Sequence, residues 1–163
     1  MIVVLMGVSG SGKSTLAEAL VARTGWFFAE GDDYHSEANR AKMKAGIPLT
    51  DEDRQPWLDA LHGVLAGWRR DGISGILTCS ALKQSYRSRL MGGIDGVRLV
   101  WLDPDRATLE FRMAHRTGHY MNPNLLDSQI ATLEPPMGED VLHLAGGETA
   151  EVAAGRVLDW LAS

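Results

Sequence analysis

The stretch that decides the fold is GVSGSGKST at residues 7–15, which fits the pattern G-x-x-x-x-G-K-[ST]. Glycines let successive backbone N–H groups converge on phosphate oxygens, and a following helix adds the positive end of its dipole. In such a loop Lys13 reaches the β- and γ-phosphates, and the Ser14 hydroxyl ligates Mg²⁺. The alternative, a glycine-rich turn without a ligand, has no need of the Lys-Ser pair. We predict that the nucleotide is bound by Gly7, Val8, Ser9, Gly10, Ser11, Gly12, Lys13, Ser14 and Thr15.

The segments on both sides of this loop alternate between short apolar runs and longer helical patterns. Apolar runs predict strands at residues 2–6, 26–29, 76–79, 97–102 and 141–144. Helical spacing predicts helices from about residue 16 to Gly25, at 37–45, after Thr50, and at 82–91, 105–116, 127–133 and 150–161. This alternation is typical of a parallel sheet with helices on both faces. We therefore predict a three-layer α/β fold and a single domain over residues 1–163.

Two acidic residues are predicted to cap helices. Pro56 fits a helix only in its first turn, which favours Asp53 as the N-cap of the helix after Thr50. Asp103 ends an apolar run, where a mechanochemical ATPase carries an Asp-Glu pair, but it precedes Pro104 and also fits an N-cap. The sequence also lacks the Asn-Lys-x-Asp and D-x-x-G segments of a GTPase. These features favour a compact kinase for a small acceptor.

Composition and charge exclude several other classes of protein. The 163 residues carry 16 Lys and Arg against 21 Asp and Glu, a formal charge of −5, which argues against a nucleic-acid or membrane-surface binder. The single cysteine, Cys79, has no partner in the chain for a disulfide, which fits a reducing compartment. No apolar run is long enough to span a bilayer, and no basic signal region precedes the first strand. We expect a cytoplasmic protein.

Acidic residues follow the second predicted strand in the segment EGDDYH at residues 30–35. In doubly wound sheets ligands bind at the carboxyl ends of the strands, where this segment lies. A kinase needs a carboxylate within reach of the acceptor hydroxyl, to orient it and take its proton. We assign that role to Asp32, and we expect Glu30 to hold water around Mg²⁺. The alternative is a solvated turn before a helix.

Basic residues supply the other charge of the predicted site. Arg112 and Arg116 are four residues apart, so they share a helix face that leads into a loop able to fold over the nucleotide. The alternative is an exposed, solvated pair. Arg54 follows three acids, which either neutralise it or leave it to clamp an anionic substrate. For Lys83 and Arg87 a solvated face and a functional role are equally compatible with the pattern.

Several further segments carry a resemblance to a known family. The chain resembles the gluconokinases, which are related to shikimate kinases and nucleoside monophosphate kinases. The resemblance covers about residues 2–136, and the DRxPWL and CSALK segments are its most specific parts, because shikimate and nucleotide kinases lack them. The matching segments are residues 7–15, Gly31-Asp32 with His35, residues 42–49, DEDRQPWL at 51–58, CSALK at 79–83, Tyr86-Arg87, Arg116 with Gly118-His119, Ser128-Gln129 and TLEP at 132–135.

This resemblance implies a specific reaction and site. Gluconokinases transfer the γ-phosphoryl group of ATP to the 6-hydroxyl of D-gluconate and require Mg²⁺. The family has a five-stranded parallel sheet and a mobile lid, here at approximately 112–134, and is commonly homodimeric. The assigned roles are catalysis by Lys13, Asp32 and Arg116, ATP contacts from Arg112 and Arg116, gluconate binding by Asp32, His35, Arg54 and Lys83, and Mg²⁺ binding by Ser14 and Glu30.

Two departures and two alternative functions accompany this assignment. Family members carry Asp at the position of Glu30, and this chain has few basic residues after His119. One alternative function is a kinase of the same fold for another sugar acid or a shikimate-like acceptor. The other is a nucleotide-dependent switch module, which would not need Asp32 and Arg54 in these settings.

Overall fold

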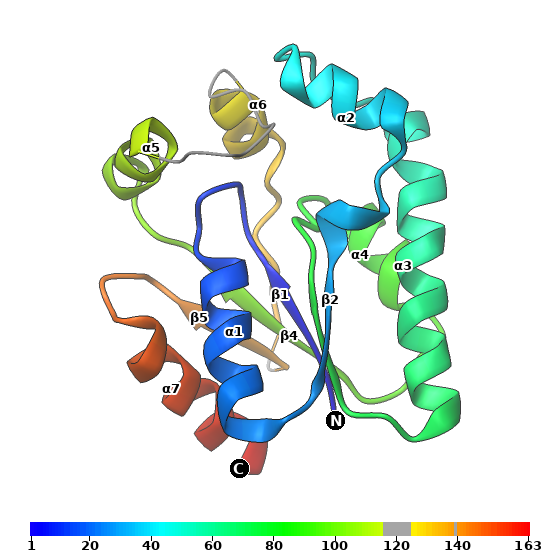
Figure 1. The fold of residues 1–163 in the computed structure, drawn as a ribbon, viewed down its shortest axis with the longest axis vertical. Coiled ribbons are helices and arrows are strands. Elements are labelled where there is room, and N and C mark those ends of the chain that lie inside the picture. Colours follow the sequence, from blue (N-terminus) through cyan, green and yellow to red (C-terminus); the bar gives the residue numbers. More distant parts are fainter. Residues whose placement is uncertain (116–124, 139) are drawn as a thin grey trace.

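The computed structural model describes residues 1–115, 125–138 and 140–163. Its centre is a five-stranded parallel sheet in the order β2-β3-β1-β4-β5, with β1 in the middle (Figure 1). The strands are β1 (Ile2–Met6), β2 (Phe27–Glu30), β3 (Gly75–Thr78), β4 (Val97–Leu102) and β5 (Val141–Leu144). The predicted five-stranded parallel sheet is confirmed, and β2 and β3 are each shifted by one residue from the prediction.

Helices cover both faces of the sheet, as the alternating sequence pattern predicts. The described helices are α1 (Lys13–Thr24), α2 (Glu37–Lys44), α3 (Asp51–Asp71), α4 (Gln84–Met91), α5 (Arg106–His115), α6 (Leu125–Thr132) and α7 (Ala150–Ala162), with a 3₁₀ turn η1 at Gly31–Tyr34. Side chains alternate across β1: Val3 and Leu5 pack on α1 and α7, whereas Val4 and Met6 pack on α3 and α4. The fold therefore has three layers with two apolar cores.

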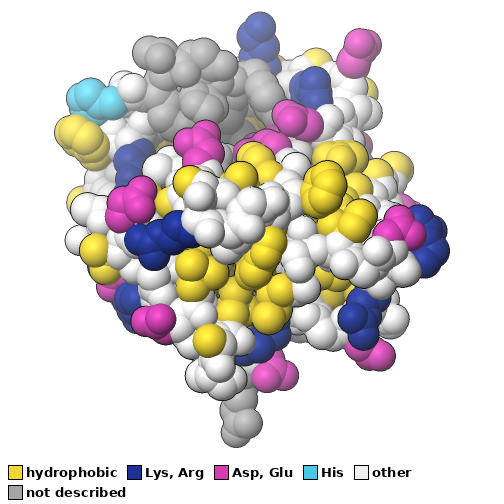
Figure 2. Space-filling view, turned by 60° about the horizontal axis from the view of Figure 1, so that its bottom comes forward, with side chains coloured by type: hydrophobic (Ala, Val, Ile, Leu, Met, Phe, Trp, Pro, Cys, Tyr) yellow, Lys and Arg dark blue, Asp and Glu magenta, His cyan; other side chains and the backbone are white. Residues whose placement is uncertain are grey.

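The carboxyl ends of the strands carry the remaining elements. In Figure 1 these ends point upward, and α2, α5 and α6 lie above them. The opposite face, at the amino ends of the strands, is shown in Figure 2. It carries Lys and Arg side chains among Asp and Glu, with hydrophobic side chains between them. Within the described chain no helix is both long enough and apolar enough to cross a membrane. Cys79 is buried and carries a free thiol.

The prediction that Asp53 caps α3 is wrong. Thr50 is the N-cap: its hydroxyl accepts from the Asp53 N–H, while the Asp53 carboxylate accepts from the Thr50 N–H. This capping box satisfies two amides at once, so the helix begins before Asp53. Pro56 consequently lies beyond the first turn, and the carbonyl that it leaves without a donor belongs to the exposed residue Glu52.

The prediction that Asp103 caps the next helix is also wrong. The carboxylate that accepts from the helix amides belongs to Asp105, which lies 2.8 Å from the Thr108 nitrogen. Asp103 instead lies 2.9 Å from Nε2 of His143, a side chain that stacks on Trp101. The helix α5 begins at Arg106, directly after Asp105, so the carboxylate of Asp105 lies next to the first free helix amides.

Candidate active site

The phosphate-binding loop joins the central strand to α1. Its backbone takes up left-handed conformations at Gly10 and Gly12, and a Cβ at Gly7 would lie 2.6 Å from the Leu102 carbonyl. Gly12 is the N-cap of α1 and offers no side chain to the first helix amides, which suits them to an anion. Lys13 Nζ donates to the Gly7 and Val8 carbonyls at 2.8 and 3.1 Å. The local structure is therefore that of an anion-binding loop.

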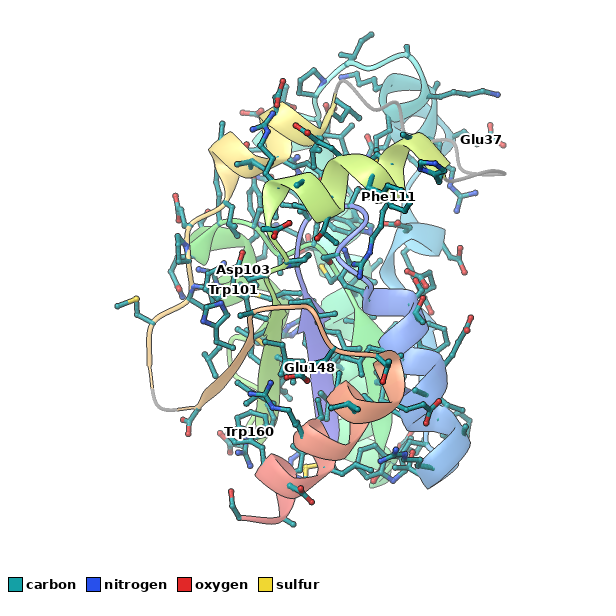
Figure 3. The ribbon with its side chains drawn as sticks, turned by 90° about the vertical axis from the view of Figure 1, so that its left-hand side faces the viewer. Glu37, Trp101, Asp103, Phe111, Glu148 and Trp160 are labelled. Carbon is teal, nitrogen blue, oxygen red and sulfur yellow. The ribbon has the colours of Figure 1, made fainter. Side chains whose placement is uncertain are left out.

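A cavity of about 730 Å³ opens in front of this loop. That volume suits a cofactor-sized ligand. Its walls are the loop, α5 and the turn before α7. Figure 3 shows Phe111 on α5 and Glu148 in the turn before α7. The predicted nucleotide-binding residues from Ser9 to Thr15 line it together with Glu30, Asp32, Phe111, Arg112, His115, Gly146, Gly147 and Glu148.

The two predicted Mg²⁺ ligands meet in this cavity. The Ser14 hydroxyl lies 2.6 Å from Glu30 Oε2, and the Thr78 hydroxyl donates to Glu30 Oε1 at 2.7 Å. Oxygen donors of this kind fit Mg²⁺, which takes one or two protein ligands and completes its shell with phosphate and water. Across residues 1–115, 125–138 and 140–163 no cluster of three His, Cys, Asp or Glu could hold a metal by itself. The residues present fit a metal that arrives with a phosphate ligand.

A second, smaller cavity adjoins the first. Its lining includes three of the predicted acceptor-binding residues, Asp32, His35 and Arg54. Ser9, Lys13 and Asp32 line both cavities, so the two spaces meet at the phosphate loop. Lys83, the fourth predicted acceptor-binding residue, lines neither cavity; its Nζ pairs with Asp51 at 3.2 Å.

His35 is held as a neutral donor. It is buried, stacks on Trp57 at 4.1 Å, and its Nδ1 lies 3.2 Å from the Asn39 amide nitrogen. That nitrogen also donates to the Asp53 carbonyl, so Nδ1 accepts and the ring proton lies on Nε2. Burial, together with Arg54 and Arg40, lowers the pKa of His35 to about 4. Of the three predicted acceptor-binding residues that line the smaller cavity, Arg54 is therefore the cation.

Two of the three acids before Arg54 have other partners. Asp51 accepts from the Tyr86 hydroxyl and Lys83, which lowers the pKa of its carboxyl, and Asp53 pairs with Lys42 at 2.8 Å. Arg54 Nη1 donates to the Leu49 carbonyl at 2.8 Å and to the Tyr86 hydroxyl at 3.0 Å. Of the two alternatives for Arg54, the structure favours a guanidinium that is available to an anionic ligand.

The tip of the phosphate loop is held from two helices. Arg112 of α5 donates from Nη1 to the Gly10 carbonyl at 2.9 Å, so it is not simply a solvated side chain. Gln129 of α6 accepts from the Ser9 N–H at 2.7 Å and donates to the Ser9 hydroxyl at 3.1 Å. Arg116, predicted to act beside Arg112, lies outside the described residues, as does the segment 117–124 that was expected in the lid.

Arg87 has a structural role, which the sequence left open. It is 2% exposed and donates to the Ala81, Leu82 and Glu134 carbonyls. These bonds join the segment before α4 to the segment after α6. Arg87 therefore does not lie on a solvent-exposed helix face.

Sequence reasoning assigned no site role to four residues that shape the site. Trp57 stacks on His35 and donates from Nε1 to the Gly31 carbonyl at 2.8 Å. Asn39 sets the His35 tautomer, Tyr86 contacts Arg54, and Gln129 binds the loop. Trp57, Tyr86 and Gln129 belong to segments that carry the family resemblance, whereas nothing in the pattern marks Asn39.

Comparisons with known proteins agree with this geometry. A family model described as an AAA domain matches residues 2–136. A gluconokinase from Gluconobacter oxydans is 46% identical over 145 residues, covering 89% of this chain and 82% of the relative. The solved structure of a sugar kinase from Janibacter sp. has a TM-score of 0.92 and 45% identity, covering 98% of this chain and 93% of that one. A gluconokinase structure from Sinorhizobium meliloti has a TM-score of 0.81 and 40% identity, covering 99% and 95%.

Proposed function

This chain belongs to the gluconokinase family of ATP-dependent P-loop kinases, and we propose on that premise that it phosphorylates the 6-hydroxyl of D-gluconate. The products are 6-phospho-D-gluconate and ADP. The observation that carries the proposal is the meeting of the two cavities at Lys13 and Asp32. A nucleotide in the larger cavity and an acceptor in the smaller one would face each other at these two side chains.

The larger cavity provides the nucleotide side of the reaction. The amides at the start of α1 and the Lys13 ammonium would bind the β- and γ-phosphates, which carry the negative charge. Arg112, already at the loop tip, and Arg116 would contact the same phosphates. Ser14 and Glu30 are the residues that would hold Mg²⁺, which neutralises charge on the phosphate oxygens when bound.

The smaller cavity provides the acceptor side. The Asp32 carboxylate orients the 6-hydroxyl and takes its proton as the new oxygen–phosphorus bond forms and the bond to the ADP oxygen breaks. Arg54 binds the carboxylate at the other end of gluconate, and His35 donates from Nε2 to one of its hydroxyls. Lys83, which was expected to bind gluconate directly, contributes instead through Asp51.

The first test is a coupled assay of ADP release with MgATP and a panel of acceptors. D-Gluconate, other hexonates, shikimate and AMP are compared, and the phosphorylated carbon of the product is identified by NMR. We expect a strong preference for D-gluconate and a product phosphorylated at carbon 6. Activity confined to another acceptor would replace the assignment of the substrate, and nucleotide binding without any transfer would favour a switch module.

The role of Asp32 is tested in the same assay. Asp32→Asn keeps the size of the side chain but removes the base, so we expect kcat to fall roughly 100-fold or more. The Kd for MgATP should stay unchanged. Near-wild-type turnover would exclude Asp32 as the base.

We also propose that the protein forms a homodimer, as its resemblance to the family implies. Light scattering on the purified chain gives the mass directly. A mass of twice the chain's 17.7 kDa supports the dimer, and a single-chain mass at assay concentration contradicts it.

A further inference from the structure

We propose that Tyr86 is a positioning residue that aims the Arg54 guanidinium at the carboxylate of the acceptor. In this way Tyr86 sets the preference of the site for a sugar acid over a neutral polyol. The inference rests on the proposed function, because it requires an acceptor that carries a carboxylate.

The hydrogen bonds of Arg54 leave one edge of its guanidinium for a ligand. The Nη1 nitrogen carries two N–H groups, and these donate to the Leu49 carbonyl and the Tyr86 hydroxyl. Among the described residues nothing accepts a hydrogen bond from Nε or Nη2. Those two nitrogens form the side-on edge that binds a carboxylate with two parallel hydrogen bonds. Arg54 also lines the acceptor cavity.

The Tyr86 hydroxyl is itself held in one orientation. Tyr86 is 5% exposed, and its hydroxyl lies 2.5 Å from Asp51 Oδ1. An ionised carboxylate can only accept a hydrogen bond, so the Tyr86 hydroxyl donates to Asp51. A lone pair of the same oxygen then accepts from Arg54. The Arg54 guanidinium carbon also lies 5.1 Å from the centre of the Tyr86 ring. Two contacts therefore fix the plane of the guanidinium.

The Tyr86 hydroxyl also takes the place of a direct ion pair between Arg54 and Asp51. A direct Arg54–Asp51 ion pair would occupy the edge that the acceptor needs, and it would offset the positive charge. In the structure the phenol oxygen lies between the two groups, and Lys83 Nζ contacts the same Asp51 oxygen at 3.2 Å. Asp51 thus pairs directly with Lys83 and acts on Arg54 only through space, so the Nε–Nη2 edge of Arg54 remains for the acceptor.

The test compares Tyr86→Phe with a matched control, Tyr34→Phe. Both changes remove one phenol hydroxyl; Tyr34 is 41% exposed and lines neither cavity. We measure kcat, the KM values for gluconate and MgATP, and the inhibition constant of D-glucitol, which has the same carbon chain but no carboxylate. Thermal unfolding of each variant checks that it is folded.

We expect Tyr86→Phe to raise the KM for gluconate roughly tenfold, as for the loss of one hydrogen bond to a charged group. The KM for MgATP and the inhibition constant of D-glucitol should stay at their wild-type values, and Tyr34→Phe should change none of them. An unchanged KM for gluconate would overturn the inference. So would an equal rise in the D-glucitol constant, because it would indicate general damage to the cavity.

A double-mutant comparison separates positioning from an independent structural effect. In an Arg54→Ala background, Tyr86→Phe should cause no further rise in the KM for gluconate. A further tenfold rise there would overturn the inference even if the single variant behaved as expected. A wild-type protein that is inactive on gluconate would instead overturn the proposed function, and this inference with it.

Discussion

At the scale of single residues, a neutral His35 was not predictable from its position after Asp32. The sequence segment suggests a functional histidine, but its charge depends on Trp57 and Asn39, which are brought to it by α3 and α2. Asp32 and Arg54, in contrast, were identified from motifs, and both line the smaller cavity. Motifs therefore identified two side chains that line one cavity, but they did not specify the protonation of His35.

The depressed pKa of His35 predicts a pH dependence of stability. In the unfolded chain His35 binds a proton at its ordinary pKa of 6.5, whereas in the folded chain it does so at about 4. The contribution of neutral His35 to the unfolding free energy is therefore complete above pH 6.5 and is lost as the pH falls toward 4. Between pH 7 and 4.5 the wild type should lose about 2 kcal/mol more unfolding free energy than His35→Gln, which does not titrate. Urea unfolding at both pH values measures the difference; equal losses would contradict a neutral, buried His35.

At the scale of secondary structure elements, the existence of every described α-helix and strand was predicted, but the N-cap residues of α3 and α5 were not. Asp53 and Asp103 are both acids close to a proline, and a preference for acids at N-caps selected them. The actual caps, Thr50 and Asp105, are identified by which side chain faces the free amides. That geometry depends on the backbone path of the loop before the helix, which the local sequence does not specify.

The capping box of α3 predicts a measurable loss when it is removed. Thr50→Ala takes away the hydroxyl that accepts from the Asp53 N–H, and we expect it to lower the unfolding free energy by about 1 kcal/mol. Thr50→Ser keeps the hydroxyl and serves as the control, with a loss well below that value. Equal stabilities of the Ala and Ser variants would contradict the role of the cap.

The contact between α6 and the phosphate loop predicts a kinetic effect. Gln129→Leu removes both hydrogen bonds to Ser9, so the loop tip loses its support on that side. We expect kcat/KM for MgATP to fall roughly tenfold. Ser9→Ala, which keeps the bond from the Ser9 N–H, should show a smaller loss; a Gln129→Leu variant with wild-type kinetics would show that the contact does not support the loop.

At the scale of the whole molecule, alternation of strands and helices predicted the three layers and the parallel sheet. It did not predict the order of the strands or the contacts that close the molecule around the site. Arg87 illustrates the difference: its spacing from Lys83 suggested a shared helix face, but the fold buries it among carbonyls from two distant segments. Contacts over such sequence separations follow from the topology rather than from local patterns.

Arg87 predicts a large loss of global stability. Arg87→Met leaves the carbonyls of Ala81, Leu82 and Glu134 without their buried donor, and we expect the unfolding free energy to fall by about 3 kcal/mol. Arg89→Met on the same helix removes an exposed pair with Asp59 and should change stability by less than about 1 kcal/mol. Similar losses in the two variants, measured by urea unfolding, would contradict the distinction.

The two cavities that meet at Ser9, Lys13 and Asp32 have a consequence for whether both substrates are bound at the same time. Apart from these three shared residues each cavity has its own lining, so under the proposed function neither substrate has to build the binding site of the other. Initial velocities at varied ATP and gluconate should therefore give intersecting double-reciprocal lines, the signature of a ternary complex. Parallel lines would instead indicate a phosphorylated enzyme as an intermediate, which a direct meeting of the two ligands makes unnecessary.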